Sequence, residues 1–422
     1  MKPSVAVVGG GWAGCAAALI LAEAGVNVTL FEASRTLGGR ARAAELDGRQ
    51  VDNGQHMLLG AYATTLDLLT RLGRHEADSL WRRPLRLDAP PAFSLACPPW
   101  PAPFNLLAGF VAARGLNWQE KWSALQWSRK LLAGTQPPAG STVAMLTRTQ
   151  PARVNHWLWH PLCIAALNTP PETACAHTFV AILRGALGGH RTHSDFLLPR
   201  RHLSALFPEP AAERIRALGG TVHTGQRVRA IEAGHDAVTL RINDTAPGFS
   251  RVIIAVAPQH LHALTEYVRE LDNVRRMVAQ YTYQPIATAY LQFDPGFHLP
   301  QPVLALTDGP AQYVFDRGLS HGQAGLLACV ASAARDLSAG WLDQAEAQLR
   351  QVASPGPVRW RRAIVEKQAT YGCVADLPRP PVSTPHPGIF LAGDYTAGPY
   401  PATLESATTS GVQSALALLN SL

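Results

Sequence analysis

The stretch from Val5 to Glu32 constrains the fold of this 422-residue chain more than any other part of the sequence. Val5–Val8 is a short apolar run bounded by glycine, which predicts a strand buried on both faces of a parallel sheet. An Ala- and Leu-rich segment follows and predicts a helix that runs to about Ala24. A second apolar run, Val28–Phe31, predicts the next strand. This order indicates a β-α-β unit of the dinucleotide-binding type.

Three glycines between the first strand and the helix have the spacing G-x-G-x-x-G. Gly9 permits the tight turn, Gly11 lets the backbone approach a pyrophosphate, and Gly14 lets the helix pack close to the strand. The helix N-terminus presents free N–H groups and a partial positive charge to the phosphates. Glu32, at the end of the second strand, is placed to accept hydrogen bonds from a ribose diol, and a loop that binds nothing would leave this acid unexplained.

Composition indicates a globular protein and bears on its partners. Apolar residues make up 47% of the chain and charged residues 16%, and a chain of 422 residues is too long for one simple core, so we expect two domains. The formal net charge of +7 favours binding to an anionic partner. Because the basic residues are scattered and no nucleic-acid-binding motif is present, we expect no nucleic acid but an anionic cofactor or an anionic membrane surface.

The six cysteines form no C-x-x-C pair and have no histidine at a spacing typical of zinc. We therefore predict no metal site and a reducing, cytoplasmic environment. We expect no signal peptide before Val5, because the first predicted strand begins almost at Met1. Residues 5–22 are uncharged for long enough to resemble a membrane span, but their three glycines favour a buried β-α unit.

Two further segments near the first unit carry a resemblance to a known superfamily. Gly38-Gly39-Arg40 suits backbone that passes close to a ligand, with a guanidinium near phosphate. Asp52–His56 comes next and precedes a predicted helix at about Ala61–Leu72. This order resembles the superfamily of flavin-dependent amine oxidases and phytoene desaturases, in which a second glycine-rich segment follows the acid. The resemblance implies FAD as the cofactor, and nothing in the sequence requires a covalent link to it.

The C-terminal part of the chain extends the resemblance. Gly388–Asp394 predicts a buried strand that ends in Gly-Asp, and Pro401–Glu405 opens a helix of small residues. In the superfamily such an acid binds the ribityl or pyrophosphate region, and such a helix N-terminus points at the flavin N1/O2 edge, which becomes anionic on reduction. The cofactor site implied in this way consists of Gly9, Gly11, Trp12, Ala13, Gly14, Glu32, Ala33, Gly39, Arg40, Gly54, Gln55, His56, Val228, Ala257, Gly393, Asp394, Thr403 and Leu404.

Residues 75–194 predict a helical insertion. Helical periodicity recurs at residues 116–134 and 157–188, whereas the prolines within 84–103 exclude a helix there and predict a stiff, winding connection. Residues 266–384 predict a mixed sheet beneath the insertion, from strand-like runs at Ile286–Phe293, Leu326–Ser332 and Val358–Val365.

The cofactor domain resumes after the insertion. Arg200–Leu218 predicts a helix, Gly219–His223 begins a strand, residues 228–242 predict a β-meander, and Arg251–Val256 predicts a buried strand. With the resemblance, we expect an α/β fold whose Rossmann-like, glutathione-reductase-type FAD domain is discontinuous and which has a separate substrate domain. The FAD domain would comprise residues 1–74, 195–265 and 385–422, and the substrate domain residues 75–194 and 266–384.

Within the superfamily, the chain resembles the bacterial hydroxysqualene dehydroxylases over essentially its whole length. The block Pro161–Glu172 is the more specific part of this resemblance, since the flavin motifs occur throughout the superfamily. Cys175 and His177 depart from the pattern, because we would expect small or polar residues there, and this departure bears on pocket shape. The segments that carry the resemblance are Asp52–Tyr62, Pro161–Glu172, Leu198–Arg200 with Leu203–Pro210, and Gly393–Thr396.

The resemblance implies reductive removal of the allylic hydroxyl of hydroxysqualene to give squalene, with reduced FAD as hydride donor. Departure of hydroxide needs a proton donor. Our candidates for catalytic groups near the flavin ring are His56 and Lys367, although a structural hydrogen bond for His56 and a solvated strand end for Lys367 stay open. No second G-x-G-x-x-G follows a predicted strand, so the electron donor is external and of unknown identity.

Three other functions stay open. A carotenoid or phytoene desaturase would have a similar flavin site in a longer chain, and an amine oxidase would have an aromatic cage around the flavin. A non-catalytic prenyl-lipid carrier of the same fold would bind lipid without flavin. The intact Gly-Gly-Arg and Gly-Asp segments argue against such a carrier.

A hydrophobic isoprenoid substrate is insoluble in water, so its binding tunnel would open onto lipid. Residues 80–135 combine tryptophans with basic residues, a composition typical of a region that lies on a membrane surface. We expect a cytoplasmic protein peripheral on the inner membrane face, while tryptophans buried in the core of the insertion are an equal alternative. The residues concerned are Trp81, Trp100, Trp118, Trp122 and Trp127 with Arg82, Arg83, Arg86, Lys121, Arg129 and Lys130.

Overall fold

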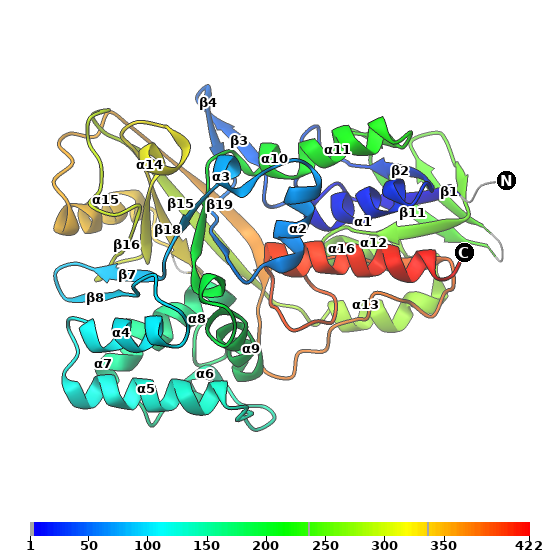
Figure 1. Cartoon of the computed structure of the whole chain (residues 1–422). Helices are drawn as coiled ribbons and strands as arrows, with labels where there is room; N and C mark the ends of the chain where they lie inside the picture. The colour runs from blue at the N-terminus through cyan, green and yellow to red at the C-terminus, as the bar shows by residue number, and fades with distance from the viewer. Residues whose placement is uncertain (1–3, 235–236, 336) are drawn as a thin grey trace.

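The computed structural model describes residues 4–234, 237–335 and 337–422 (Figure 1). One end of the molecule is built on a five-stranded sheet in which every neighbouring pair runs parallel. Its strands come from widely separated parts of the chain, so its carboxyl edge collects loops from all of them. In sheet order the strands are β10 (Thr221–His223), β2 (Asn27–Phe31), β1 (Ser4–Val8), β14 (Arg251–Ile254) and β20 (Ile389–Leu391).

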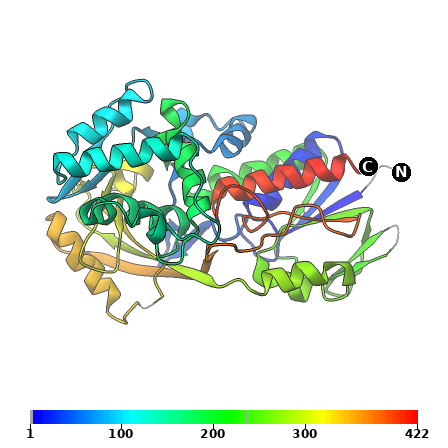
Figure 2. The ribbon, with the colours of Figure 1, turned by 90° about the horizontal axis from the view of Figure 1, so that it is seen from below.

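Alternate residues of β1 enter the two faces of this parallel sheet. Val5 and Val7 pack in one core with helices, and Ala6 and Val8 pack in another core with a β-meander. Figure 2 shows the helices on one side of the sheet and the meander on the other. The helices are α1 (Trp12–Glu23), α11 (Pro208–Ala217) and α16 (Leu404–Leu419), and the meander is β11 (Val228–Ala233), β12 (Val238–Ile242) and β13 (Gly248–Phe249).

The predicted β-α-β unit is confirmed. β1 and β2 pair in parallel from Ser4 opposite Asn27 to Val8 opposite Phe31, and α1 connects them. Gly25 follows α1 with a φ of +75°, the left-handed conformation with which glycine commonly ends a helix. The uncharged residues 5–22 are therefore a buried strand and helix, as predicted. Among the helices that the structure describes, none is long and apolar enough to cross a membrane.

The second sheet is antiparallel throughout its described pairs, whereas the sequence predicted a mixed sheet. β16, β17 and β18 follow one another through short connections, which join antiparallel neighbours and are too short for parallel crossovers. Helix α15 (Trp341–Val352) packs against one face. In sheet order the strands are β16 (Val303–Ala305), β17 (Tyr313–Asp316), β18 (Leu326–Ser332), β15 (Tyr283–Gln292) and β19 (Trp360–Tyr371), with α14 (Arg317–His321) between β17 and β18.

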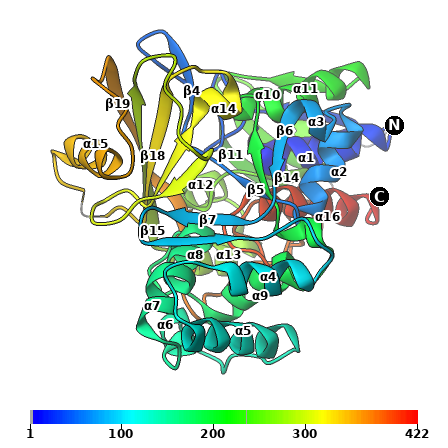
Figure 3. The same cartoon turned by 60° about the vertical axis from the view of Figure 1, so that its left-hand side comes forward.

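The predicted helical insertion lies beside this second sheet (Figures 1 and 3). The helical run at 157–188 is interrupted at Asn168, since this residue has a φ of +47° and ends a helix ahead of Pro170 and Pro171. Its amide Nδ2 donates to the Thr370 hydroxyl at 3.0 Å, which ties the insertion to β19. The helices are α4 (Phe104–Ala112), α5 (Trp118–Leu132), α6 (Val143–Thr147), α7 (Ala152–Val154), a π-helical turn (Asn155–Trp159), α8 (His160–Leu167) and α9 (Ala176–Leu187).

Two predictions about connecting segments need correction. Residues 84–103 contain no helix, as predicted, but they are not a mere winding connection, because β7 (Arg86–Ala89) and β8 (Phe93–Ala96) form a hairpin with Pro90 and Pro91 in its turn. The predicted helix at 200–218 is two helices, α10 (Leu203–Leu206) and α11. Phe207, the residue before Pro208, leaves helical geometry with φ −135° and ψ −55° and so separates them.

Short elements complete the fold. β3 (Ala43–Leu46) and β4 (Arg49–Asp52) form a hairpin, while β5 (Leu58–Leu59), β9 (Phe196–Pro199) and β6 (Leu80–Arg83) form a small antiparallel sheet. The helices outside the larger groups are α2 (Ala63–Arg71), α3 (Glu76–Ser79), α12 (Pro258–Leu264) and α13 (Asp272–Val278). The domain boundaries stated above stay a prediction.

Candidate functional site

The N-terminus of α1 opens at the carboxyl edge of the parallel sheet without a side-chain cap. Gly11 is its N-cap residue, and the first turn contains no acidic side chain. Trp12 and Ala13, which we predicted at this position, are the first helical residues, and both are buried. Because the first N–H groups of a helix have no partner within it, this N-terminus offers donors and partial positive charge to an anion.

The predicted glycines have the geometry that their roles require. A Cβ on Gly9, whose φ is +112°, would lie 2.6 Å from the carbonyl oxygen of Ala255, and one on Gly14 would lie 1.8 Å from the carbonyl oxygen of Gly9. Gly11 has open space beside it, since the nearest atom to a Cβ there would be the Cα of Gly39 at 3.9 Å. Side chains at Gly11 or Gly39 would fill this space, which is therefore a cradle suited to a pyrophosphate.

The Glu32 carboxylate lies beside the same glycine loop. Its Oε2 accepts from the Gly10 N–H at 2.6 Å, and its Oε1 accepts from the Ser34 N–H at 2.7 Å. The Glu32 carbonyl accepts from the N–H of Gln226 at 2.9 Å, which brings the segment leading to Val228 to the end of β2. Two predicted contacts of the cofactor, Glu32 and Val228, are thus on neighbouring segments.

Ala33 and Ala257 follow the carboxyl ends of two strands of the parallel sheet. Ala33 comes after β2 and is exposed, while Ala257 comes after β14 and is the N-cap residue of α12. Parallel strands present their carboxyl ends at one edge of a sheet, which is where ligands bind in such folds. The placement agrees with the predicted site, and their contacts with a cofactor stay a prediction.

Residues from the two ends of the chain meet at Arg40 and Asp394. The Arg40 Nη2 donates to Oδ2 of Asp394 at 2.6 Å, and its Nη1 donates to the Ala369 carbonyl at 2.7 Å. Burial alone would lower the pKa of Arg40, but the buried Asp394 carboxylate outweighs it, so that the pKa is raised. Arg40 therefore keeps its charge directly after Gly39, beside the cradle.

The N-terminus of α16 lies at the same site. Thr403 is its N-cap residue, with Oγ1 accepting from the Ser406 N–H at 3.1 Å, and Leu404 is its first helical residue. The N–H of Gly393 donates to the Ser410 hydroxyl at 2.8 Å, which ties the Gly-Asp segment to α16. The predicted C-terminal half of the site is therefore assembled next to the N-terminal half.

A buried carboxylate in the first turn of α16 also caps a second helix. Glu405 is 3% exposed and accepts from the N–H groups of Thr64 and Thr65 at 2.9 Å each and from the Thr65 hydroxyl at 2.7 Å. These donors belong to the first turn of α2, so one negative charge stabilises two helix N-termini. The sequence analysis missed this contact.

Arg379, which the sequence analysis also missed, holds the loop between Asp394 and α16. Its guanidinium donates to the carbonyls of Asp394 at 2.9 Å, Gly398 at 3.0 Å and Tyr400 at 2.8 Å. It lies over the ring of Tyr371, 5.6 Å from the ring centroid. The loop that carries Asp394 is therefore fixed by one cation.

The turn at Gly54–His56 follows β4 and contains two predicted site residues with polar side chains. Gly54 has a φ of +94°, and the Nδ1 of His56 lies 2.9 Å from the Gly54 carbonyl oxygen. That nitrogen therefore carries the hydrogen, which leaves Nε2 as the free ring atom of neutral His56. Burial lowers the pKa of His56 despite this hydrogen bond.

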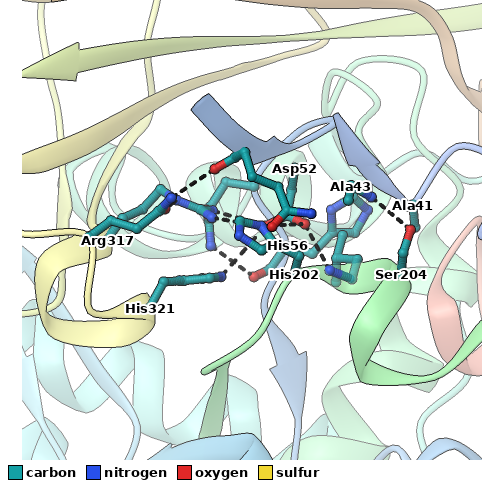
Figure 4. A network of polar contacts seen from close by, with 12 residues as sticks. Ala41, Ala43, Asp52, His56, His202, Ser204, Arg317 and His321 are labelled. Carbon is teal, nitrogen blue, oxygen red and sulfur yellow. Dashed lines mark hydrogen bonds and ion pairs between the residues drawn. The ribbon is translucent and has the colours of Figure 1, made fainter. Parts of the chain in front are cut away.

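A buried ionic cluster lies directly before this turn (Figure 4). The Nη1 of Arg317, a fully buried residue, donates to Oδ2 of Asp52 at 3.0 Å and to Oε1 of Gln55 at 2.6 Å. The rings of His202 and His321 flank the carboxylate at 3.8 Å and 3.5 Å. Arg317 thereby fixes Gln55, and with it the turn that carries His56. The cluster was not predicted.

Burial and the neighbouring polar groups strongly shift the pKa values of Asp52 and His321 in this cluster. Burial alone would raise the pKa of Asp52, but His202, His321 and the Arg317 charge outweigh it and hold the pKa well below its usual range. Burial lowers the pKa of His321 to about 4, so this ring is neutral around Asp52 at physiological pH. The cluster therefore contains an Asp–Arg ion pair beside the neutral ring of His321.

Helix α10 connects the cluster to the loop that precedes Arg40. The N–H of Leu203 donates to Oδ1 of Asp52 at 2.8 Å. The Ser204 hydroxyl accepts from the Ala43 N–H at 2.9 Å (Figure 4). The same hydroxyl donates to the Leu37 carbonyl at 2.9 Å. The segment that carried part of the resemblance, Leu203–Pro210, thus anchors both flanks of the second glycine-rich loop.

Lys367 lies within β19, which contradicts the expectation that it ends its strand. The strand continues to Tyr371 because its pairing with β15 resumes on the far side of a bulge between Gln284 and Ile286. Lys367 is exposed on this strand, two residues before Ala369, which accepts from Arg40. A catalytic role for Lys367 stays a prediction.

These features together fit a flavin nucleotide. The uncapped α1 N-terminus and the glycine cradle suit a pyrophosphate, Glu32 suits a ribose, and the α16 N-terminus suits an anionic ring edge. Within residues 4–234, 237–335 and 337–422, no cluster of His, Cys, Asp and Glu side chains could hold a metal ion, and all six cysteines are free thiols. Redox chemistry through a flavin is what this arrangement can support.

Comparisons with known proteins agree with this interpretation. The model of the family "Flavin containing amine oxidoreductase" matches residues 12–419. A hydroxysqualene dehydroxylase of Zymomonas mobilis is 27% identical over 443 aligned positions, which cover 98% of this chain and 99% of the relative. A probable zeta-carotene desaturase of Synechococcus elongatus is 25% identical over 503 positions, 98% of each chain. The crystal structure of an oxidoreductase from Methanosarcina mazei has a TM-score of 0.73 at 17% identity, covering 98% of this chain and 99% of that one.

Proposed function

Because the chain belongs to the family of flavin-containing amine oxidoreductases, we propose that it removes the allylic hydroxyl of hydroxysqualene reductively and forms squalene. The chain is an FAD-dependent oxidoreductase. The observation that carries the finer proposal is the full-length likeness to the dehydroxylase of Zymomonas mobilis. The desaturase of Synechococcus elongatus aligns over 503 positions against 443, so it needs more insertions to cover the same share of this chain.

The reaction sets three requirements for the site. Hydroxide is a poor leaving group, so a proton must reach it as the C–O bond breaks. The allylic cation that remains is delocalised and needs surroundings without nucleophilic water. The carbon must also be held against the hydride source. When bound, FAD in its reduced form supplies the hydride.

His56 is the proton donor in this proposal. The Gly54 carbonyl holds Nδ1, so Nε2 is the atom that takes up a proton and delivers it to the departing hydroxyl. Because burial lowers its pKa, the protonated ring is a stronger acid than a solvated histidine. Lys367, exposed on β19 near the Arg40 contact, is the second candidate.

The other predicted site residues would bind and position the cofactor. Gly11, Gly39 and Arg40 would hold the pyrophosphate, and Glu32 would hold the adenosine ribose. The N-terminus of α16 at Thr403 and Leu404 would place partial positive charge at the ring edge that becomes anionic. We propose that the protein works in the cytoplasm at the inner membrane face and takes electrons from an external donor.

Anaerobic turnover tests the proposed reaction. The holoenzyme is reduced chemically and mixed with detergent-solubilised hydroxysqualene, and the lipid extract is analysed by mass spectrometry. We expect squalene from the reduced enzyme and none from the oxidised enzyme. The matched variant His56→Gln should keep its flavin absorbance and lose about 100-fold or more in rate, as is typical when a general acid is removed.

A second candidate, carotenoid desaturation, is tested with the same preparation. Phytoene or ζ-carotene is supplied to the oxidised enzyme. Desaturated product from either compound, together with no squalene from hydroxysqualene, would replace the proposed reaction.

A further inference from the structure

Six large apolar side chains are exposed on and around helices α4 and α5, and we call this surface the α4–α5 face. It contains half of the twelve large apolar side chains that are exposed in the described parts of the chain. Monomeric proteins rarely expose such a cluster without a partner. The exposed fractions are 56% for Trp100, 60% for Phe104, 42% for Leu107, 48% for Val111, 63% for Trp118 and 53% for Trp122.

The exposed side chains of each helix lie along one stripe of that helix. On α4, Phe104, Leu107 and Val111 follow the three- and four-residue spacing of one helical stripe, and the opposite stripe with Leu106 and Phe110 is buried. On α5, Trp118 and Trp122 are one turn apart, and Lys121 between them donates to the Val111 carbonyl at 2.7 Å. Figures 1 and 3 place α5 at the outer edge of the helical region, with α4 between it and the β7–β8 hairpin, and both helices lie away from the parallel sheet.

The surroundings of the face are strongly basic. Between Asp88 and Glu172 the chain has one acidic residue, Glu120, and its carboxylate is used in the capping box of α5 with Asn117. The same stretch has six basic residues: Arg114, Lys121, Arg129, Lys130, Arg148 and Arg153. Arg153 pairs with Glu120 at 3.9 Å, and five basic residues remain in excess. An apolar surface on a segment with excess positive charge is complementary to an apolar phase with a negatively charged surface.

We propose that the α4–α5 face docks on the anionic surface of a lipid bilayer, with its six apolar side chains in the headgroup region. The proposal deepens the proposed function and rests on it, because a water-insoluble isoprenoid substrate dissolves in the bilayer. A second copy of the chain is a poor occupant, since two such faces would bring two basic segments together. No described helix could span the bilayer, so the face lies on the membrane surface.

The structure separates the tryptophans that the sequence grouped together. Trp127 packs against Trp159, with ring centroids 4.4 Å apart, and Trp81 lies beneath the guanidinium of Arg83 at 5.1 Å. These two rings pack against the protein itself and are outside the docking face. The alternative to membrane contact was that the tryptophans pack inside the insertion. Trp127 does so, whereas Trp100, Trp118 and Trp122 are exposed.

Vesicle flotation with purified holoenzyme tests the docking face. Vesicles of phosphatidylcholine are compared with vesicles that also contain phosphatidylglycerol, at low and high salt. We expect binding to the anionic vesicles that weakens with salt, and a loss of at least about tenfold in the double variant Trp118→Gln/Trp122→Gln. Arg114→Glu/Arg129→Glu should lose the preference for anionic lipid. Tyr267→Gln removes an aromatic ring that is 62% exposed elsewhere and should bind as the wild type does.

Folding and turnover controls keep this proposal distinct from the proposed reaction. All three variants should keep their flavin absorbance and melting temperature and should turn over detergent-solubilised hydroxysqualene normally. The tryptophan and arginine variants should lose turnover of vesicle-embedded hydroxysqualene, whereas Tyr267→Gln should keep it. Flotation is read without turnover, so a failed reaction leaves the membrane result intact. Wild-type protein that stays in the soluble fraction, or a tryptophan variant that floats normally, overturns the proposal. Concentration-dependent dimers that the tryptophan variant abolishes would assign the face to self-association instead.

Discussion

The guanidinium of Arg40 donates to the carboxylate of Asp394 at 2.6 Å, although 354 positions separate the two residues in the chain. The pair joins the second glycine-rich loop to the Gly-Asp segment after β20. We expect Arg40→Met to weaken FAD binding about 10- to 100-fold, because a charge-assisted hydrogen bond contributes about 1.5–3 kcal/mol. Fluorescence titration of apoprotein with FAD measures the change. Arg71→Met, which removes an exposed ion pair with Asp67, is the control and should bind FAD normally.

Glu32 tests the adenosine end of the site separately. In Glu32→Ala the acceptor for the ribose diol is lost, and the N–H of Gly10 loses its partner at 2.6 Å. Weaker FAD binding by about 1.5–3 kcal/mol per charged hydrogen bond is expected. Flavin occupancy equal to that of the wild type in the purified variant would argue strongly against the assignment of Glu32.

Breaking the Asp52–Arg317 pair should strongly reduce the free energy of unfolding. Arg317→Met leaves the Asp52 carboxylate buried without its cation, which typically costs about 3–5 kcal/mol. The double variant Arg317→Met/Asp52→Asn should recover part of that loss, because the remaining amide is neutral. Chemical unfolding measures both values, and Arg362→Met, which removes an exposed pair with Asp47, should change stability by about 1 kcal/mol or less. Equal destabilisation by the single and double variants would contradict the pairing.

Protonation of His321 should make folding stability depend on pH. Its pKa in the folded protein is about 4, below the ordinary value of 6.5, because the ring is buried beside Arg317. The unfolded chain therefore binds the proton more readily between these values, and stability falls as the pH drops below about 6.5. The loss at pH 5 should be about 2 kcal/mol. His321→Gln should reduce this slope, whereas the exposed His75→Gln should keep it.

The proposed role of His56 as proton donor leads us to expect that turnover depends on pH. If its protonated ring is the acid, kcat falls as the pH rises through a pKa that burial places below the ordinary 6.5. The rate of squalene formation by pre-reduced enzyme across pH 5–8 measures this. His56→Gln should give a low and flat profile, and an unchanged profile in that variant would remove His56 from the mechanism.

Local patterns were sufficient to predict the β-α-β unit that contains the first half of the candidate site. Gly9, Gly11, Gly14 and Glu32 lie within one continuous β-α-β unit, whose geometry follows from neighbouring residues alone. The contact between Arg40 and Asp394 could be anticipated only through the resemblance, because nothing local to either residue specifies the other.

The buried ionic contacts could not be predicted, because their partners come from distant segments. Arg317 directly follows an apolar strand, where its sequence position indicates a solvated side chain. It is nevertheless fully buried against Asp52. Arg379 and Glu405 likewise have ordinary local surroundings, and tertiary contacts alone decide that they bind loop carbonyls and a helix N-terminus. In α5, the sequence could not tell which side is buried, because small residues such as Ala124 and Ser128 form the packed side and Trp118 and Trp122 the exposed one.

The position of β20 at the edge of the parallel sheet bears on how the protein is made. This strand and α16 are translated long after the glycine-rich loop, since Asp394 follows Arg40 by 354 residues. A nascent chain that lacks them has one half of the nucleotide site, an open sheet edge beside β14 and an α1 without its partner helix. We therefore expect flavin capture to be a late step of biogenesis, because the site is complete only after β20 and the N-terminus of α16 have been synthesised.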